Sequence, residues 1–98
     1  MNTAGRTGAE TLRRTVTIIN TRGLHARAAA RFVCCAEGYE ADVRVARHDT
    51  EVSGRSIMGL MMLAAAPGCS IDISASGPQA AAALAALVDL VENRFDED

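Results

Sequence analysis

The sequence predicts an α+β domain in which an open sheet of four strands is covered on one face by three helices. Four segments alternate apolar and polar residues, as half-buried strands do, and three others repeat apolar residues every three to four positions, as amphipathic helices do. The core must be aliphatic, because 49% of the 98 residues are apolar but only one tyrosine, two phenylalanines and no tryptophan are present. A chain of this length forms a single domain.

The two ends of the chain are expected to lie outside the folded domain, which the pattern places at residues 14–95. Residues 1–13 are rich in Thr, Gly and Arg and have no apolar period, which is typical of a disordered tail. Residues 96–98 are all acidic, and carboxylates at the end of a helix oppose its dipole. A solvated C-terminal end is therefore expected there rather than a site.

The first strand is expected from Arg14, with Val16 and Ile18 on one side. After a polar turn, a helix is expected to begin at about Ala26 and to end before Gly38, a residue type that is common at the C′ position. The core-facing side chains of this helix are three and four positions apart, and they are Ala29, Phe32, Val33 and Ala36.

A β-hairpin is expected next, with strands at residues 41–45 and 50–53 and with His48 in the polar turn between them. The last strand alternates over residues 69–76, and the last helix is expected to follow with Pro78 at its first position. The buried side of that helix is expected to comprise Ala81, Leu84, Leu87, Val88 and Val91, with Phe95 as a further candidate.

A short segment between the hairpin and the last strand is apolar on nearly every side of the helix that it would form. Ser56 belongs to a residue type that caps helix N-termini, so a short helix is expected to follow it over residues 57–63. A helix this short cannot bury every face against one sheet, and Leu60 and Leu63 are assigned to the core. The alternative is a helix buried on all sides. Surface positions apt for contact with several partners are expected among Ile57, Met58, Met61 and Met62.

Charge and composition argue against several kinds of partner. A net charge of −2 leaves no basic stripe for nucleic acid, no apolar run is long enough to cross a bilayer, and the N-terminus lacks the apolar segment of a secretory signal. Adjacent Cys34 and Cys35 within a set of three cysteines make a poor disulfide framework, and neither His25 nor His48 has zinc-ligand spacing. The chain is expected to be a cytoplasmic monomer that needs no metal or other cofactor.

His25 stands where the first strand gives way to a helix, within the segment GLHAR at residues 23–27. The first turn of a helix has N–H groups without intrahelical partners and carries partial positive charge, so anions bind there. A phosphate on the imidazole would lie against those N–H groups, and the guanidinium of Arg27 would be a further partner. The alternative is that His25 is merely a surface residue at the start of a helix.

Two motifs together resemble the HPr family, the histidine-containing phosphocarriers of the phosphoenolpyruvate-dependent phosphotransferase system. They are the GLHAR segment and the segment SIMGLM at residues 56–61, and the likeness extends from about Arg14 to Phe95. The resemblance implies an open-faced β-sandwich in which the antiparallel sheet has the spatial order first, fourth, second, third strand. The apolar pattern alone permits a ferredoxin-like arrangement instead.

The same resemblance implies roles for individual residues. His25 would accept a phosphoryl group on Nδ1 from phospho-enzyme I and pass it to a histidine of an EIIA-type protein, and Arg27 would contact that group. Ser56 would be the serine that HPr kinase/phosphorylase modifies in some bacteria. Ala28 departs from the family pattern, which often has proline there, and it adds an N–H to the first helical turn. Partner proteins would contact Ile57, Met58 and Met61.

Two kinds of function remain open on this basis. A phosphocarrier, which has no small-molecule substrate of its own, would serve either carbohydrate uptake through sugar permeases or a nitrogen-type relay that ends on a soluble EIIA-like protein. A ferredoxin-like interaction or ligand-binding module would use the methionine-rich helix for docking, and His25 would be incidental. A small hydrolase is not supported, because no nucleophile or paired carboxylates are spaced next to His25.

Overall fold

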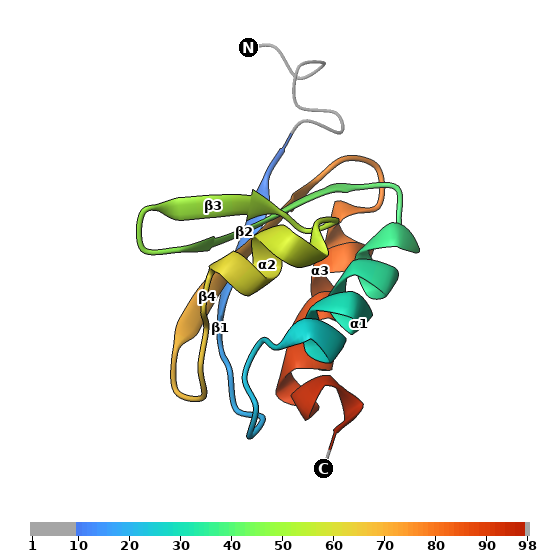
Figure 1. Ribbon diagram of the computed structural model, residues 1–98. Helices are drawn as coiled ribbons and strands as arrows, with labels where there is room; N and C mark the ends of the chain where they lie inside the picture. The colour runs from blue at the N-terminus through green and yellow to red at the C-terminus, as the bar shows by residue number, and fades with distance from the viewer. Residues whose placement is uncertain (1–9, 98) are drawn as a thin grey trace.

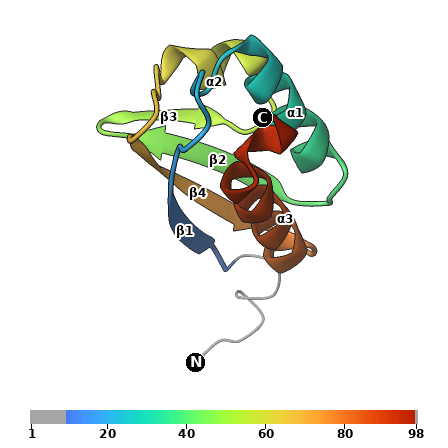
Figure 2. The same cartoon turned by 90° about the horizontal axis from the view of Figure 1, so that it is seen from below.

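The computed structural model describes residues 10–97, which form a four-stranded antiparallel sheet with three helices on one side of it (Figure 1, Figure 2). The spatial order of the strands is β1-β4-β2-β3. This order confirms the open-faced β-sandwich that the family resemblance implies, and it is not the ferredoxin-like arrangement. The elements are β1 (Leu12–Thr17), α1 (Ala26–Glu37), β2 (Asp42–Arg47), β3 (Thr50–Ser53), α2 (Ile57–Met62), β4 (Ser70–Ser76), α3 (Ala80–Glu92) and the 3-10 turn η2 (Arg94–Asp96).

β1 begins earlier than the apolar alternation predicts. Leu12 pairs with Ala75 and Arg13 pairs with Ser74, so β4 continues the ladder beyond Arg14. The expected boundary between tail and domain after residue 13 is therefore too late, because the exposed arginines hide the strand pattern at this end. Residues 1–9 of the expected tail lie outside the described residues.

The core lies between the sheet and the helices and is mainly aliphatic. α1 buries the four predicted residues and also Ala28, and Phe32 at its centre is fully buried. The strands add alternate residues, which are Val16, Val43, Val45, Ile71, Ile73 and Ala75. Between residues 10 and 97, no helix is both long and apolar enough to cross a membrane.

α3 begins at Ala80, so Pro78 lies in the preceding turn and not at the first helical position. The chain needs this turn to leave the sheet, and Gly77 has the positive φ of 113° that the turn requires. The expected buried side is correspondingly wrong at its start, since Ala81 is exposed. The residues that α3 buries are Ala80, Ala83, Leu84, Leu87, Val88 and Val91.

The end of α1 differs in detail from expectation. Gly38 has a φ of −77°, so it is the C-cap of α1 and not the left-handed C′ residue. Its N–H donates to the carbonyl of Cys35 at 3.1 Å, which closes the last turn.

The three cysteines are free thiols. Cys35 and Cys69 are partly buried, and burial raises the pKa of Cys35, whereas Cys34 is exposed and fills no part of the core.

Candidate functional site

Two features constrain the loop that leads to His25. Gly23 has a φ of 67°, and the N–H of Leu24 donates to the carbonyl of Ala65 at 2.9 Å. A Cβ on Gly23 would lie 2.6 Å from that same carbonyl oxygen, so glycine is required for both conformation and space. Because Leu24 is buried, the loop presents His25 at a fixed place before α1.

His25 is the N-cap residue of α1, and its imidazole serves as the capping group. The Nδ1 atom accepts a hydrogen bond from the backbone N–H of Arg27 at 3.3 Å, which is long for such a bond and holds Nδ1 weakly. In any α-helix the first N–H groups lack intrahelical acceptors, and in α1 they include those of Ala26 and Ala28. An anion bonded to Nδ1 would therefore lie at the positive end of the α1 dipole.

Glu97 contacts the other nitrogen of the ring. Its Oε2 lies 2.7 Å from Nε2 of His25, and the two side chains are only 15% and 17% exposed, respectively. A carboxylate accepts hydrogen bonds, so the hydrogen of this contact lies on Nε2, while Nδ1 is the atom that accepts from Arg27. The expectation of a solvated acidic end is thus wrong for Glu97, while Asp98 lies outside the described residues.

Asn20 lies behind Glu97 and is fully buried, although the sequence indicates only a polar turn there. Its Nδ2 donates to the carbonyl of Gly23 at 2.8 Å and to Oε1 of Glu97 at 3.2 Å. The reverse orientation of the amide would place Oδ1 against these two acceptor oxygens. Within the described part of the chain, Oδ1 itself has no hydrogen-bond partner. The amide therefore supports both the loop before His25 and the carboxylate beside it.

The charge state of Glu97 follows from these contacts. Burial favours the neutral acid, but hydrogen bonds from His25 and Asn20 and electrostatic attraction to the His25 ring and to Arg31 outweigh it. The pKa of the Glu97 carboxyl is consequently lowered from its usual value. Glu97 is a carboxylate at neutral pH.

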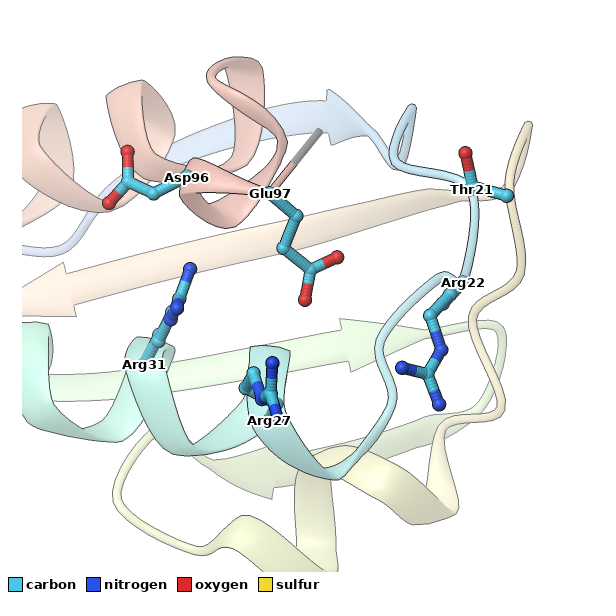
Figure 3. Close-up of a pocket in the computed structure, with 6 residues that line it drawn as sticks. All are labelled: Thr21, Arg22, Arg27, Arg31, Asp96 and Glu97. Atoms are coloured by element: carbon cyan, nitrogen blue, oxygen red, sulfur yellow. The ribbon is translucent and has the colours of Figure 1, made fainter.

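Three arginines line a hollow beside Glu97 (Figure 3). Arg27 and Arg31 extend from α1 toward Glu97, and Arg22 comes from the loop before α1. With Thr21, Asp96 and Glu97 they line a hollow of about 400 Å³. His25 lines a smaller hollow of about 220 Å³, and Arg22 lines both. The hollow beside Glu97 thus holds three guanidinium groups, which are suited to binding a phosphoryl group.

α2 presents an apolar surface that is separate from these charges. Leu60 and Leu63 are buried as predicted, and Ser56 caps the helix by accepting from the N–H of Gly59 at 2.9 Å. The alternative of a fully buried helix is therefore wrong. The exposed residues, here called the α2 patch, are Ile57 (40% exposed), Met58 (72%), Met61 (41%) and Met62 (74%).

The structure brings His25 and Arg27 together but places Ser56 elsewhere. The loop of His25 is bonded to Ala65, which follows the C-terminal end of α2, whereas Ser56 precedes its N-terminal end. A helix of six residues is about 9 Å long, so the α2 patch lies between the two positions.

Comparison with known proteins establishes the family. Residues 12–93 match the family model PTS-HPr, "PTS HPr component phosphorylation site". Phosphocarrier protein HPr of Pseudomonas aeruginosa is 53% identical over 83 residues, which cover 84% of this chain and 92% of that protein. Phosphocarrier protein NPr of Escherichia coli K12 is 39% identical over 89 residues, which cover 90% and 99%, respectively.

A solved structure agrees with the sequence matches. The crystal structure of HPr-C-His from Thermoanaerobacter tengcongensis has a TM-score of 0.85 and 39% sequence identity to this chain, covering 89% of this chain and 98% of that one. The strand order, the histidine at the start of α1 and these matches define a small phosphoryl-carrying protein with an open-faced β-sandwich. The chain belongs to the HPr family, the phosphocarriers of the phosphotransferase system.

Proposed function

We propose that this phosphocarrier accepts a phosphoryl group on Nδ1 of His25 from phospho-enzyme I and passes it to an EIIA-type protein. The observation that carries the proposal is the arrangement of the ring. Nε2 bonds Glu97 at 2.7 Å, while Nδ1 is held only by a 3.3 Å contact with the N–H of Arg27. The nitrogen with the available lone pair is thus the one that faces the helix terminus and its N–H groups.

Transfer would use groups that are already in place. The lone pair of Nδ1 forms a bond to phosphorus, the donor's bond to phosphorus breaks, and its electron pair returns to the donor atom. The Arg27 guanidinium and the first N–H groups of α1, including that of Ala28, would bind the phosphoryl oxygens. A helix terminus stabilises such a charge by ~0.3–1 kcal/mol when exposed and up to ~2 kcal/mol when partly buried. Modest stabilisation suits a carrier, because the group must leave again.

The α2 patch is the surface proposed for contact with enzyme I and the acceptor. Ile57, Met58 and Met61 are exposed and belong to the helix whose C-terminal end adjoins the His25 loop. A partner that covers these side chains would bury apolar area close to the phosphoryl group, and flexible thioethers adapt to more than one partner. We expect the protein to work as a monomer in the cytoplasm.

The direct test of this function uses phosphoenolpyruvate and enzyme I. The wild-type protein is expected to gain one acid-labile phosphate, measured by intact mass, and His25→Ala is expected to gain none. His48→Asn is the matched control, because His48 is exposed in the hairpin turn with a φ of 56° that asparagine tolerates. Absence of phosphate on the folded wild-type protein would contradict the proposal and favour an interaction module instead.

Ser56 is proposed as a site for an HPr kinase/phosphorylase. A phosphate would add about −1.5 to −2 charges at the start of α2, where a helix accepts negative charge. It would therefore weaken docking on the neighbouring α2 patch by electrostatics and leave the fold unchanged. Ser56→Asp is expected to raise the KM of enzyme I for this protein while the circular dichroism spectrum stays the same. A markedly altered spectrum would count against this mechanism.

The acceptor distinguishes the two uses of a phosphocarrier. Relatives named HPr and NPr both match this chain along most of its length. Transfer from the phosphorylated protein to the EIIA of a sugar permease would place it in carbohydrate uptake, and transfer to a soluble nitrogen-type EIIA would place it in a regulatory relay. The relative rates of the two transfers, measured side by side, decide between them.

A further inference from the structure

We propose that Glu97, supported by Asn20, is a positioning residue that keeps the hydrogen of His25 on Nε2 and balances the charge that the ring gains when Nδ1 is phosphorylated. The transfer step in this inference rests on the proposed function. The choice of tautomer does not, since it concerns the unphosphorylated protein.

Both oxygens of the Glu97 carboxylate are engaged. Oε2 accepts from Nε2 of His25 at 2.7 Å and Oε1 accepts from Nδ2 of Asn20 at 3.2 Å. Two bonds from different segments fix the plane of the carboxylate, and Asn20 is itself immobilised by full burial and by its bond to Gly23. A hydrogen bond to an ionised acceptor is roughly twice as strong as a neutral one. The contact therefore selects one tautomer and one orientation of the imidazole.

The backbone after α3 adopts an unfavourable conformation that brings Glu97 to this place. Three successive non-glycine residues, Arg94, Phe95 and Asp96, have φ values of 58°, 55° and 63°. L-residues rarely adopt this left-handed conformation, and never cheaply in series. Strain of this kind persists where surrounding contacts over-determine it, and such places are often functional.

Specific contacts hold the strained turn. Phe95 is fully buried, its carbonyl accepts from Nη1 of Arg31, and the N–H of Glu97 donates to the carbonyl of Arg94 at 2.9 Å. The result is visible in Figure 1, where the end of the chain turns back beside the start of α1. The turn thus delivers a carboxylate from the far end of the sequence to the nitrogen that is not phosphorylated.

Phosphorylation changes the charge of the ring that Glu97 faces. When Nδ1 forms its bond to phosphorus and the donor atom takes back its electron pair, the hydrogen on Nε2 stays in place. The ring then carries a positive charge shared between both nitrogens, and the carboxylate on Nε2 stabilises it. Carboxylates that orient reacting histidines act in the same way in other proteins. Arg22, Arg27 and Arg31 line the adjoining hollow and offset the repulsion between Glu97 and the phosphoryl group.

The first measurement reads the tautomer directly. In protein with ¹⁵N-labelled histidine, at a pH where the imidazole is neutral, the ¹⁵N shifts of wild type are expected to show the Nε2–H form. Glu97→Ala is expected to show a mixture of both tautomers. Glu92→Gln is the matched control, because it removes one exposed carboxylate near the same end of the chain and leaves the His25 contact intact.

The second measurement follows phosphoryl transfer from enzyme I. The kcat/KM of enzyme I for the Glu97→Ala protein is expected to be about tenfold lower than for wild type, a loss typical of removing a carboxylate that orients a functional histidine. Glu97→Gln has the same shape and is expected to fall less, since its amide oxygen accepts from Nε2 without supplying charge. This variant also serves if Glu97→Ala alters the fold, which circular dichroism would reveal.

The outcomes separate the two proposals. Unchanged ¹⁵N shifts in Glu97→Ala would overturn the role of Glu97 in selecting the tautomer, and an unchanged kcat/KM would overturn its role in transfer. If wild type accepts no phosphate from enzyme I, the proposed function fails, whereas the ¹⁵N shifts still decide whether Glu97 fixes the ring.

Discussion

The starts of α1 and α2 use the same local device but are built differently around it. Each helix is capped by the side chain of the residue before it, His25 in α1 and Ser56 in α2. The cap of α1 is held further by Glu97 and Asn20 from distant segments, whereas the cap of α2 bonds only within its own turn. A cap alone therefore does not make a site. The partners that the fold brings to α1 give its cap a fixed tautomer and a positively charged rim.

The largest expected effect is a loss of stability when the loop before α1 is altered, compared with a matched glycine substitution in α2. Gly23→Ala forces a side chain into a left-handed conformation and against the carbonyl of Ala65, so the free energy of unfolding should fall by about 2–3 kcal/mol. In Gly59→Ala, the gain in helix propensity of about 1 kcal/mol opposes moderate crowding by Ser56 and Val52. Urea unfolding of both variants measures the difference, and equal losses would contradict it.

A smaller effect concerns the charged rim of α1. Arg27→Ala removes an exposed guanidinium and leaves the helix intact, so phosphoryl transfer from enzyme I should slow by about tenfold, the equivalent of one charge-assisted hydrogen bond. The free energy of unfolding should change by less than about 0.5 kcal/mol. Rapid-quench measurement of transfer tests the first statement. A normal rate would remove Arg27 from the proposed site.

Removing the cap of α2 is expected to lower stability without slowing phosphoryl transfer, which is the opposite of the effect expected for Arg27→Ala. Ser56→Ala removes the acceptor for the N–H of Gly59, and loss of such a cap typically costs about 1 kcal/mol. Phosphorylation of His25 should proceed at the wild-type rate, because Ser56 lies at the far end of α2 from the His25 loop. Thermal unfolding and the same transfer assay check the two parts. A slowed transfer would show that the two helix starts are coupled.

The smallest expected effect is a pH-dependent difference in stability that arises from Glu97, beside the cap of α1. The pKa of Glu97 is lowered in the folded protein, so its carboxylate stabilises the fold above the unfolded pKa, and this contribution is lost as pH falls through the folded pKa. Wild type should therefore be more stable than Glu97→Gln at pH 6, and the difference should shrink as the pH is lowered through the acid range. Urea midpoints measured as a function of pH are the test. A difference that stays constant with pH would contradict the assignment.

Much of the fold was predictable because local pattern and tertiary burial agree in most elements. The alternation in β2 and β4 and the spacing in α1 identify the residues that the core buries. Prediction fails at two boundaries for different reasons. Pro78 suits the first position of a helix, yet the chain uses it in the turn that leaves the sheet. Leu12 lies in a strand, but the exposed arginines that follow it conceal the strand pattern.

The site was predictable only in its local half. His25 and Arg27 belong to one short motif, whereas Glu97 lies 72 residues from His25 and reaches it through a left-handed turn that no residue preference favours. Asn20 is of a type common in turns, so its full burial has no sequence signal. The one available sign was Phe95, an apolar residue beyond the end of α3, which indicates that the chain stays packed there.

The hydrogen bond from Leu24 to Ala65 has a consequence for the proposed docking of more than one partner. It joins the loop before His25 to the residues that follow α2, and both segments are anchored by buried side chains. These contacts constrain the separation between the α2 patch and the imidazole. Under the proposed docking, donor and acceptor proteins of unrelated shape would need to match only that single separation between the α2 patch and the imidazole.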